Sequence, residues 1–369
     1  MKHISEYRDG KLSAPIIDSM RRTLDGRRVT FMEVCGTHTM SIYRYGIKWM
    51  LPENVNLLSG PGCPVCVTGN AYIDRAVAYS RREDVIVTSF GDMMRVPGSS
   101  SSLERERAEG RDIRVVYSTL EALDVARENP AKKVVFLGVG FETTVPTIAA
   151  SILAAQTEGL KNFLVSGANK TVPEALAAIA TGELKLNGFL GPAHVSTIIG
   201  AEPYRFLPRD HGLGVVIAGF EPLDVLHAIA MLCKQVAEDR PDVELQYSRI
   251  AREDGNPKAR EITNRVFEAC DADWRGIGVI PASGLTMREN FAAFDADRVI
   301  DVEVEATREH KGCICGNILQ GLAQPEECKL FGKACTPESP VGACMVSSEG
   351  TCAAHFKYGP SGGHRGDQV

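Results

Sequence analysis

The sequence lacks the hydrophobic runs that mark membrane and secreted proteins. No segment of its 369 residues approaches the ~20 consecutive apolar residues that span a bilayer, and residues 1–15 contain no apolar core of signal-peptide length. A basic run is also missing, because the net charge of -6 comes from charges of both signs spread along the chain. The sequence therefore gives no electrostatic footprint for nucleic acid or for an anionic membrane surface. We expect a cytoplasmic protein with soluble partners.

Disulfide cross-links are not expected in such a location. The chain has eleven cysteines, but the cytosol keeps thiols reduced, and a chain of this length does not need covalent cross-links to fold. We therefore divide the cysteines among metal binding, redox chemistry and packing. Apolar residues make up 44% of the sequence, which is enough for one large core or for two ordinary cores with an appendage.

Short β-branched runs alternate with helical stretches from residue 29 to residue 287, a pattern typical of βα units on parallel sheets. This pattern predicts two α/β domains, at residues 1–120 and 121–306, followed by a separate cysteine-rich domain at residues 307–369. The first set of expected strands is Val29–Val34, Val55–Ser59, Val85–Phe90 and Ile113–Tyr117. The second set is Lys133–Val139, Phe163–Ser166, Gly188–Leu190 and Val215–Ala218, with Gly276–Ile280 as a further candidate.

Unusual residues gather directly after these expected strands. Ligands of open α/β sheets bind outside the carboxyl ends of the strands, so the loops are expected to surround one common ligand-binding opening. The triplet Gly-Phe-Glu occurs in two of them, which hints at internal duplication. The loops are CGTHT (35–39), GPGCPVC (60–66), FGD (90–92), GFETT (140–144), SGANK (166–170), GPAHVS (191–196), GFEPLD (219–224) and PASGLT (281–286).

Six of the eleven cysteines fall within the tail that follows. Four thiolates are the usual ligands of a [4Fe-4S] cluster, and they can come from separated positions if the chain folds around the cluster. Structural zinc sites generally use close Cys-x-x-Cys pairs, which the tail lacks. An iron-sulfur cluster is the favoured interpretation, zinc and buried packing cysteines are the alternatives, and spacing alone does not select four ligands from six. The six are Cys313, Cys315, Cys328, Cys335, Cys344 and Cys352.

The motif GPGCPVC places Cys63 and Cys66 after an apolar run and before a helical stretch expected at residues 70–80. A thiol at the start of a helix is acidified by the positive end of the helix dipole. We therefore favour a dithiol that interconverts with its disulfide. Half of a metal site and a plain tight turn are the alternatives.

The motif CGTHT places Cys35 and His38 directly after a strand. A thiolate with an imidazole three residues later suits a nucleophilic pair or a metal-binding pair. A soft thiolate suits low-spin iron, whereas hydrolysis would also require an oxyanion hole and an orienting carboxylate. A structural hydrogen bond is an alternative role for His38.

The motif GFETT resembles part of a dinucleotide-binding loop. Gly138 and Gly140 form Gly-x-Gly after a strand, but Thr143 stands where the third glycine would be, so nucleotide binding is disfavoured. Glu142 is either a helix cap or a carboxylate of the active site. We favour the active-site role.

Together with the tail segment CKLFGKACTPESPVGACMVSSEGTCAA (328–354), these motifs resemble the HypD family along nearly the whole chain. The resemblance implies a Rossmann-like topology for both α/β domains and a small, mostly helical or irregular C-terminal domain that holds a [4Fe-4S] cluster. It also implies a complex with a small HypC-type chaperone, in which a transiently bound iron acquires cyanide and carbon monoxide. A HypE-type protein would deliver the cyanide.

The resemblance assigns the cluster ligands. Family members carry four cluster cysteines separated by fourteen, six and sixteen residues, and Cys313, Cys328, Cys335 and Cys352 reproduce those separations. The remaining tail cysteines, Cys315 and Cys344, are then expected to support or pack around the cluster.

The same resemblance assigns the other sites. Cys35 corresponds to the iron ligand shared with HypC, and Cys63 and Cys66 correspond to the redox pair. The family motifs near this cleft also contain His38, Glu142 and Glu349. One loop departs from the family pattern, because Asn169-Lys170 stands where His-Lys is expected.

We therefore expect a [NiFe] hydrogenase maturation factor, a redox-active assembly scaffold rather than a conventional turnover enzyme. Cyanide and carbon monoxide bind strongly to electron-rich iron(II), so a soft thiolate and a source of electrons belong beside the iron. The simplest assembly is a monomer that enters heteromeric complexes. The alternatives are an iron-sulfur-dependent thiol-disulfide oxidoreductase acting on proteins, and a scaffold that only docks HypC and HypE.

Overall fold

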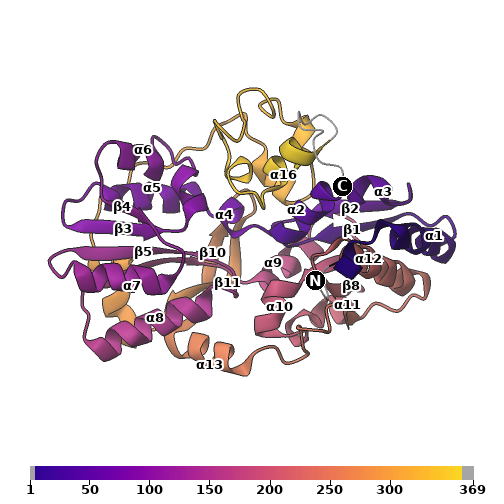
Figure 1. The fold of residues 1–369 in the computed structure, drawn as a ribbon, viewed down its shortest axis with the longest axis horizontal. Helices are drawn as coiled ribbons and strands as arrows, with labels where there is room; N and C mark the ends of the chain where they lie inside the picture. The colour runs from indigo at the N-terminus through magenta and orange to yellow at the C-terminus, as the bar shows by residue number, and fades with distance from the viewer. Residues whose placement is uncertain (1–4, 360–369) are drawn as a thin grey trace.

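The protein is an α/β protein with two parallel sheets, an antiparallel hairpin and an irregular tail (Figure 1). The computed structural model describes residues 5–359, so the first four and last ten residues of the expected domains lie outside the described residues. The first sheet has the order β2 (Val55–Ser59), β1 (Val29–Glu33), β7 (Gly188–Pro192), β8 (Gly214–Ala218) and β9 (Val243–Leu245). The second sheet has the order β4 (Ile113–Val115), β3 (Val85–Ser89), β5 (Lys133–Gly140) and β6 (Phe163–Asn169).

Helices connect the strands and cover both sheets. The helices that precede β6 in the sequence are α1 (Ser13–Leu24), α2 (Gly36–Arg44), α3 (Ile47–Met50), α4 (Pro64–Val67), α5 (Asn70–Ser80), α6 (Leu103–Ala108), α7 (Thr119–Glu128) and α8 (Val145–Glu158). The later helices are α9 (Val172–Ala180), α10 (Ala193–Ile199), α11 (Phe206–His211), α12 (Pro222–Ala237), α13 (Pro257–Val266), α14 (Ala296–Val299), α15 (Cys315–Leu319) and α16 (Thr351–Tyr358).

The grouping of strands expected from the sequence is wrong. Strands β3 and β4 pair with β5 and β6, while β7 and β8 return to pair beside β1. In chain order, all the strands of the second sheet are therefore inserted between β2 and β7 of the first sheet. Short buried parallel strands all read as β-branched apolar runs, so the sequence pattern located them without identifying their partners.

Both sheets follow the same winding. Numbered within each sheet, the strand order is 2-1-3-4-5 in the first and 2-1-3-4 in the second. Ligands of such doubly wound sheets bind where the order reverses, which is between β1 and β7 and between β3 and β5. The repeated Gly-Phe-Glu triplets follow β5 and β8, which are the third strand of one sheet and the fourth of the other, so they are not equivalent positions.

The expected strand at Gly276–Ile280 is part of an antiparallel hairpin instead. Strands β10 (Phe267–Trp274) and β11 (Gly278–Met287) form a two-stranded sheet, and the hairpin runs between the two parallel sheets (Figure 1). Isolated bridges from Thr68 to Trp274 and from Lys170 to Gly284 connect it to its neighbours.

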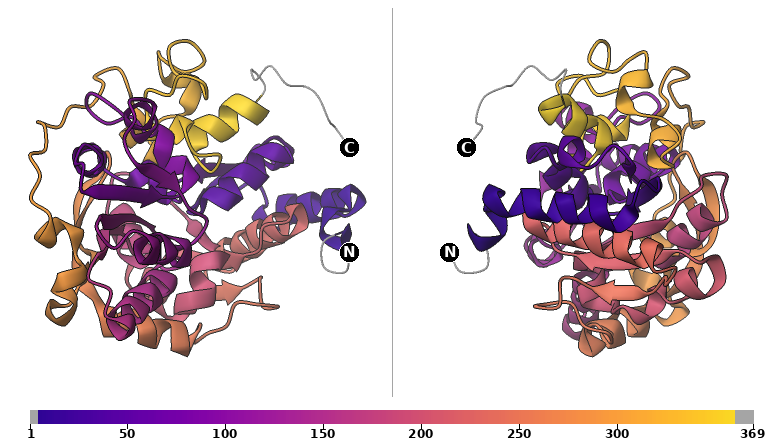
Figure 2. Two further views of the ribbon diagram at one scale, coloured as in Figure 1. Left: turned by 60° about the vertical axis from the view of Figure 1, so that its left-hand side comes forward. Right: turned by 90° about the vertical axis from the view of Figure 1, so that its right-hand side faces the viewer.

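Helices from distant parts of the chain cover one face of the first sheet. The apolar side of α1, formed by Ile17, Met20 and Leu24, is buried, and α1 lies beside α12 in both views of Figure 2. This arrangement follows from the 3.6-residue helical period, which places those three side chains on one face. No helix in the described part of the chain is long and apolar enough to cross a membrane.

The tail packs onto the α/β layers. After Ile300 the chain runs without regular structure to short helices, and α16 contacts α2 (Figure 1). One continuous buried cluster includes Met32 from β1, Trp274 from the hairpin and Cys344 from the tail. The tail therefore shares a hydrophobic core with the first sheet.

Candidate functional site

Cys35 lies at the point where β1 ends and α2 begins. It is the N-cap residue of α2 and is 8% exposed, and its backbone N–H donates to Glu33 Oε2 at 3.1 Å. Burial, followed by the negative charge of Glu349, raises the pKa of the Cys35 thiol to about 12. A bound cation would favour the thiolate, because metal ligation displaces the thiol proton.

A close backbone approach brings the loop after β2 against Cys35. The N–H of Gly36 donates to the carbonyl oxygen of Gly62 at 2.8 Å. A Cβ atom on Gly62 would lie 2.2 Å from the backbone nitrogen of Cys35, so only glycine fits there. The structure thus brings Cys35 next to the loop that carries Cys63 and Cys66.

Cys63 and Cys66 form a disulfide across the one-turn helix α4. Cys63 is the N-cap residue of α4 and Cys66 lies within this short helix, which precedes the longer helix α5. The sulfur of Cys63 accepts from Cys66 N at 3.2 Å. Both residues are buried, with exposed fractions of 3% and 0%. The pair is therefore shielded from direct contact with large molecules.

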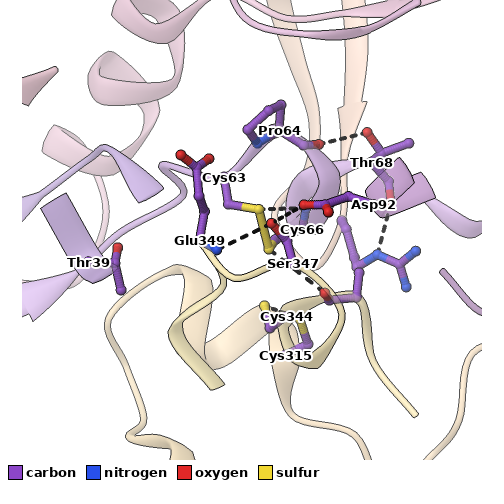
Figure 3. Close-up of a disulfide and its surroundings, with 12 residues drawn as sticks. Thr39, Cys63, Pro64, Cys66, Thr68, Asp92, Cys315, Cys344, Ser347 and Glu349 are labelled. Carbon is purple, nitrogen blue, oxygen red and sulfur yellow. Dashed lines mark hydrogen bonds between the residues drawn. A yellow bond between two sulfur atoms is a disulfide. The ribbon is translucent and has the colours of Figure 1, made fainter. Parts of the chain in front are cut away.

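Two carboxylates lie near this disulfide (Figure 3). Glu349 accepts a hydrogen bond from Thr37 Oγ1 at 2.7 Å. Asp92, which follows β3, accepts from Ser347 Oγ at 2.7 Å, and Ser347 Oγ in turn accepts from Glu349 N at 3.3 Å. Burial, reinforced by the charge of Asp92, raises the pKa of Glu349. The tail thus contributes Glu349 directly to the Cys35 site.

His38 is held by main-chain contacts. Its Nε2 lies 3.0 Å from the carbonyl oxygens of Ala218 and Gly219 at the end of β8, so Nε2 must carry the proton that is donated. Nδ1 is then unprotonated, and it has no hydrogen-bond partner within residues 5–359. Burial lowers the pKa of His38 to about 4, which keeps the ring neutral at physiological pH. This geometry fits the structural alternative for His38.

Glu142 lies at the carboxyl edge of the second sheet and contacts the start of α9. Its Oε1 accepts from Val172 N at 2.9 Å, while its buried Oε2 has no partner among the described residues. Burial raises the pKa of Glu142 to about 8. Burial, followed by the negative charge of Glu142, raises the pKa of Tyr204 well above its usual value.

The loop that departs from the family pattern lies beside Glu142. Asn169 Nδ2 donates to Gly140 O at 3.5 Å, and the Lys170 ammonium lies 5.7 Å from the centre of the Trp274 ring. Burial lowers the pKa of Lys170 to about 8. The loop therefore presents a buried amine and an amide, and no histidine.

Sequence reasoning assigned no role to three polar residues of this region, although Asp92 and His194 stand in motifs that it singled out, FGD and GPAHVS. Glu33 lies at the end of β1, fully buried, and Asp92 lies in the loop after β3. The third residue is His194, which follows β7. The centre of its ring lies 4.0 Å from the centre of the Phe220 ring, and the ring centres of Phe220 and His38 are 4.8 Å apart. A charged residue at the end of an apolar strand and a histidine in the loop after a strand were the signals available for Glu33 and His194.

The six tail cysteines line one pocket, together with apolar side chains that include Ile318 and Phe331. Cys315 Sγ and Cys344 Sγ lie 2.8 Å apart, so both share the pocket with the four expected cluster ligands. Every donor atom among these lining side chains is sulfur, which suits a thiolate-ligated iron-sulfur cluster. Among residues 5–359, no group of three or more His, Cys, Asp or Glu side chains is arranged to hold a single metal ion.

The disulfide and the cysteine pocket are neighbours. Cys66 Sγ lies 3.9 Å from the carbonyl oxygen of Ala343, and Ala343 and Cys344 both belong to the short helix η7 (Ala343–Met345). Figure 3 shows Cys315 and Cys344 on the tail side of the disulfide. The fold thus places three groups of cysteines next to one another in space: Cys35, then the Cys63–Cys66 disulfide, then the tail pocket.

These features define a class of protein: a doubly wound α/β protein with a buried thiol site covered by a cysteine-rich tail. The family model described as HypD, hydrogenase formation hypA family, matches residues 11–359. The chain therefore belongs to the HypD family of hydrogenase maturation factors.

Similar proteins cover almost the full length of the chain. It is 47% identical to hydrogenase maturation factor HypD2 of Bradyrhizobium diazoefficiens over 369 residues, which cover 97% of each chain. It is also 47% identical to HypD of Azotobacter vinelandii over 368 residues, again 97% of each chain. HypD of Rhodobacter capsulatus is 44% identical over 371 residues, 97% of this chain and 98% of the relative.

Proposed function

We propose that the protein matures [NiFe] hydrogenases by holding iron at Cys35 while cyanide and carbon monoxide ligands are installed. The observation that carries this proposal is the gathering of Cys35, the Cys63–Cys66 disulfide and six tail cysteines along one path. In this function the protein works in the cytoplasm as a monomer within complexes. Its partners are a small HypC-type chaperone and a HypE-type cyanide donor.

Iron is the cargo of the site, and Cys35 would be its ligand from this chain. Burial and nearby carboxyl groups keep the free thiol protonated, so an incoming iron ion must displace that proton. While Cys63 and Cys66 are joined as a disulfide, the residues around Cys35 supply few other soft ligands, because its neighbours Glu33 and Glu349 are oxygen donors. A partner that adds a second thiolate would complete the set preferred by low-spin iron.

A [4Fe-4S] cluster, when bound by Cys313, Cys328, Cys335 and Cys352, would supply electrons one at a time. The Cys63–Cys66 pair would instead accept two electrons. Reduction of the Cys63–Cys66 disulfide takes two electrons and two protons and leaves two thiols beside the iron. Cys344 follows Ala343, which contacts the disulfide, and within the pocket its sulfur lies 2.8 Å from that of Cys315, which makes the two cysteines candidates for an intermediate pair.

Burial of the disulfide argues against the alternative of a thiol-disulfide oxidoreductase for protein substrates. Such an enzyme needs a reactive, accessible thiol, yet Cys63 and Cys66 are almost fully covered. The other alternative, a scaffold that only docks HypC and HypE, requires no chemistry at these cysteines. Under that alternative, Cys63→Ser would leave hydrogenase maturation intact, whereas the proposed function requires maturation to fail.

Infrared spectroscopy of the protein purified with its HypC-type partner tests the iron site, because cyanide and carbonyl stretches report the cargo directly. We expect Cys35→Ala to lose these bands while the visible absorption of the cluster stays near normal. The matched control is Cys233→Ala, because Cys233 is a buried cysteine in α12 and should leave the bands in place. Bands that persist in the Cys35 variant would remove Cys35 from its role.

The cluster is tested separately by its ligands. We expect Cys328→Ala to bleach the visible absorption and to lower the iron and sulfide content, because one of four thiolate ligands is gone. Metal analysis also separates the cluster from the zinc alternative. Unchanged iron and sulfide in this variant would rule out the assigned ligand set.

A further inference from the structure

Arg275 lies between the disulfide helix and the cysteine pocket, at the turn of the β10–β11 hairpin. Its backbone N–H donates to Val67 O at 2.9 Å, and its Nε donates to Thr68 O at 2.9 Å. These two bonds attach the turn to the end of α4, the helix that carries the disulfide. The guanidinium is therefore held in place by main-chain contacts.

The other side of the turn packs on the tail. A Cβ atom on Gly276 would lie 2.0 Å from Gly316 Cα, and Gln320 Nε2 donates to Gly276 O at 2.7 Å. Gly316 follows Cys315 in α15, so the turn meets the tail at the wall of the cysteine pocket. Arg275 thus occupies the junction of the hairpin, α4 and α15.

The charge of Arg275 is buried and only partly compensated. Its side chain is 6% exposed, and Nη1 lies 3.7 Å from Oε1 of the more exposed Glu309. Its Nη2 is buried without a hydrogen-bond partner in the described part of the chain. Burying a cation is costly unless an anion lies nearby, and the helix that packs against the Arg275 turn begins at Cys315, which lines the pocket.

We propose that Arg275 is a positioning residue for electron transfer, a fixed positive charge that stabilises the reduced state of the group held in the cysteine pocket. The inference rests on the proposed function, because it assumes that the pocket holds a redox cluster. Uptake of one electron adds one negative charge to the pocket and makes or breaks no bond. A cation held beside the pocket favours that state, because its attraction for the added charge is strong where water is excluded.

The test is a redox titration of the purified protein with its cluster, followed by electron paramagnetic resonance of the reduced form. At the midpoint potential of the wild-type protein, we expect Arg275→Gln to lower the ratio of reduced to oxidised cluster about tenfold. That change corresponds to 59 mV for a one-electron couple. Arg275→Lys keeps the charge and should restore most of the ratio.

Two further variants complete the design. Glu309→Gln removes the partner carboxylate, leaves the charge of Arg275 less compensated and should raise the ratio. The matched control is Arg288→Gln, which removes an arginine that forms a surface ion pair with Glu268 near the base of the hairpin and should change nothing. If Arg275→Gln fails to fold, the rise expected for Glu309→Gln decides the question alone.

Iron and sulfide content separate the possible failures. A wild-type protein that binds no cluster would refute the proposed function itself. Full cluster content with an unchanged ratio in Arg275→Gln would overturn the role of Arg275, and so would an unchanged ratio in Glu309→Gln where the arginine variant does not fold. A fall in Arg275→Gln that Arg275→Lys does not restore would also overturn it, because shape rather than charge would then be responsible.

Discussion

Two buried glutamates of the site region, Glu33 and Glu142, have raised pKa values. Burial raises the pKa of Glu33 to about 7 and that of Glu142 to about 8. Both groups therefore keep their protons to higher pH than an exposed glutamate, which reduces the cost of burying them. Glu33 also accepts from the Cys35 N–H, so a buried acid fixes the backbone of the proposed iron ligand.

These shifts make stability depend on pH. The pKa of Glu142 is about 8 in the folded protein against 4.5 for the free group, so between these values the folded state holds a proton that the unfolded state has lost. The free energy of unfolding therefore falls as pH rises from about 4.5 to about 8. In Glu142→Gln the free energy of unfolding should fall less over this pH range than in the wild type, by an amount on the order of a few kcal/mol. The amide oxygen of the variant can still accept from Val172 N.

Urea unfolding of both proteins at pH 5, 6, 7 and 8 measures the difference. Glu53→Gln, at an exposed position, serves as the control and should follow the wild-type curve. Parallel curves for wild type and Glu142→Gln would show that Glu142 ionises normally in the folded protein.

Individual site residues were predictable where the residue type itself implies chemistry. Cys35, Cys63 and Cys66 stand in short motifs after apolar strands, and the structure brings them together. The motif FGD marked the loop of Asp92 but not its role, because that role depends on Ser347 from the distant tail. Contacts between residues so far apart in sequence come from the fold and leave no local pattern.

The loops after β1 and β2 work as one unit. Gly62 lies so close to Cys35 that a methyl group has no room. We expect Gly62→Ala to lower the free energy of unfolding by about 1 to 3 kcal/mol through overpacking. The displaced loop should also expose Cys35, so its alkylation rate should rise in parallel with the loss of melting temperature.

Gly10→Ala provides the control for this change, because a Cβ atom there would meet nothing within 4 Å. It should leave both measurements at the wild-type values. Wild-type stability together with slow alkylation in Gly62→Ala would mean that the two loops can separate without cost, and that Cys35 does not depend on the second loop for its burial.

Strands and helices were predictable from periodicity, whereas their partners were not. The expected strand Val55–Ser59 matches β2, and Lys133–Val139 covers all but the last residue of β5. The hairpin strand β10 was missed because its polar residues, such as Glu268 and Asp273, give it no clean apolar alternation. Pairing is decided by long-range packing, so the insertion of one sheet within the other could not be derived from local patterns.

At the scale of the whole molecule, the tail connects the first sheet, the hairpin and the thiol site. The expected third domain shares its core with the first sheet and the hairpin, and it supplies Glu349 to the thiol site. Its cysteine pocket borders the disulfide through Ala343. The tail thus covers the site, and in the proposed function it would give electrons a route to a disulfide that large molecules cannot touch.

The central claim is that electrons entering at the cysteine pocket reduce the Cys63–Cys66 disulfide. The most direct test supplies a one-electron donor protein, which is too large to enter the site, then quenches with acid and an alkylating reagent and counts modified cysteines by mass spectrometry. The account predicts that Cys63 and Cys66 become alkylated in the protein with its cluster and stay joined in Cys328→Ser. Equal reduction in both proteins, or none in either, would contradict it.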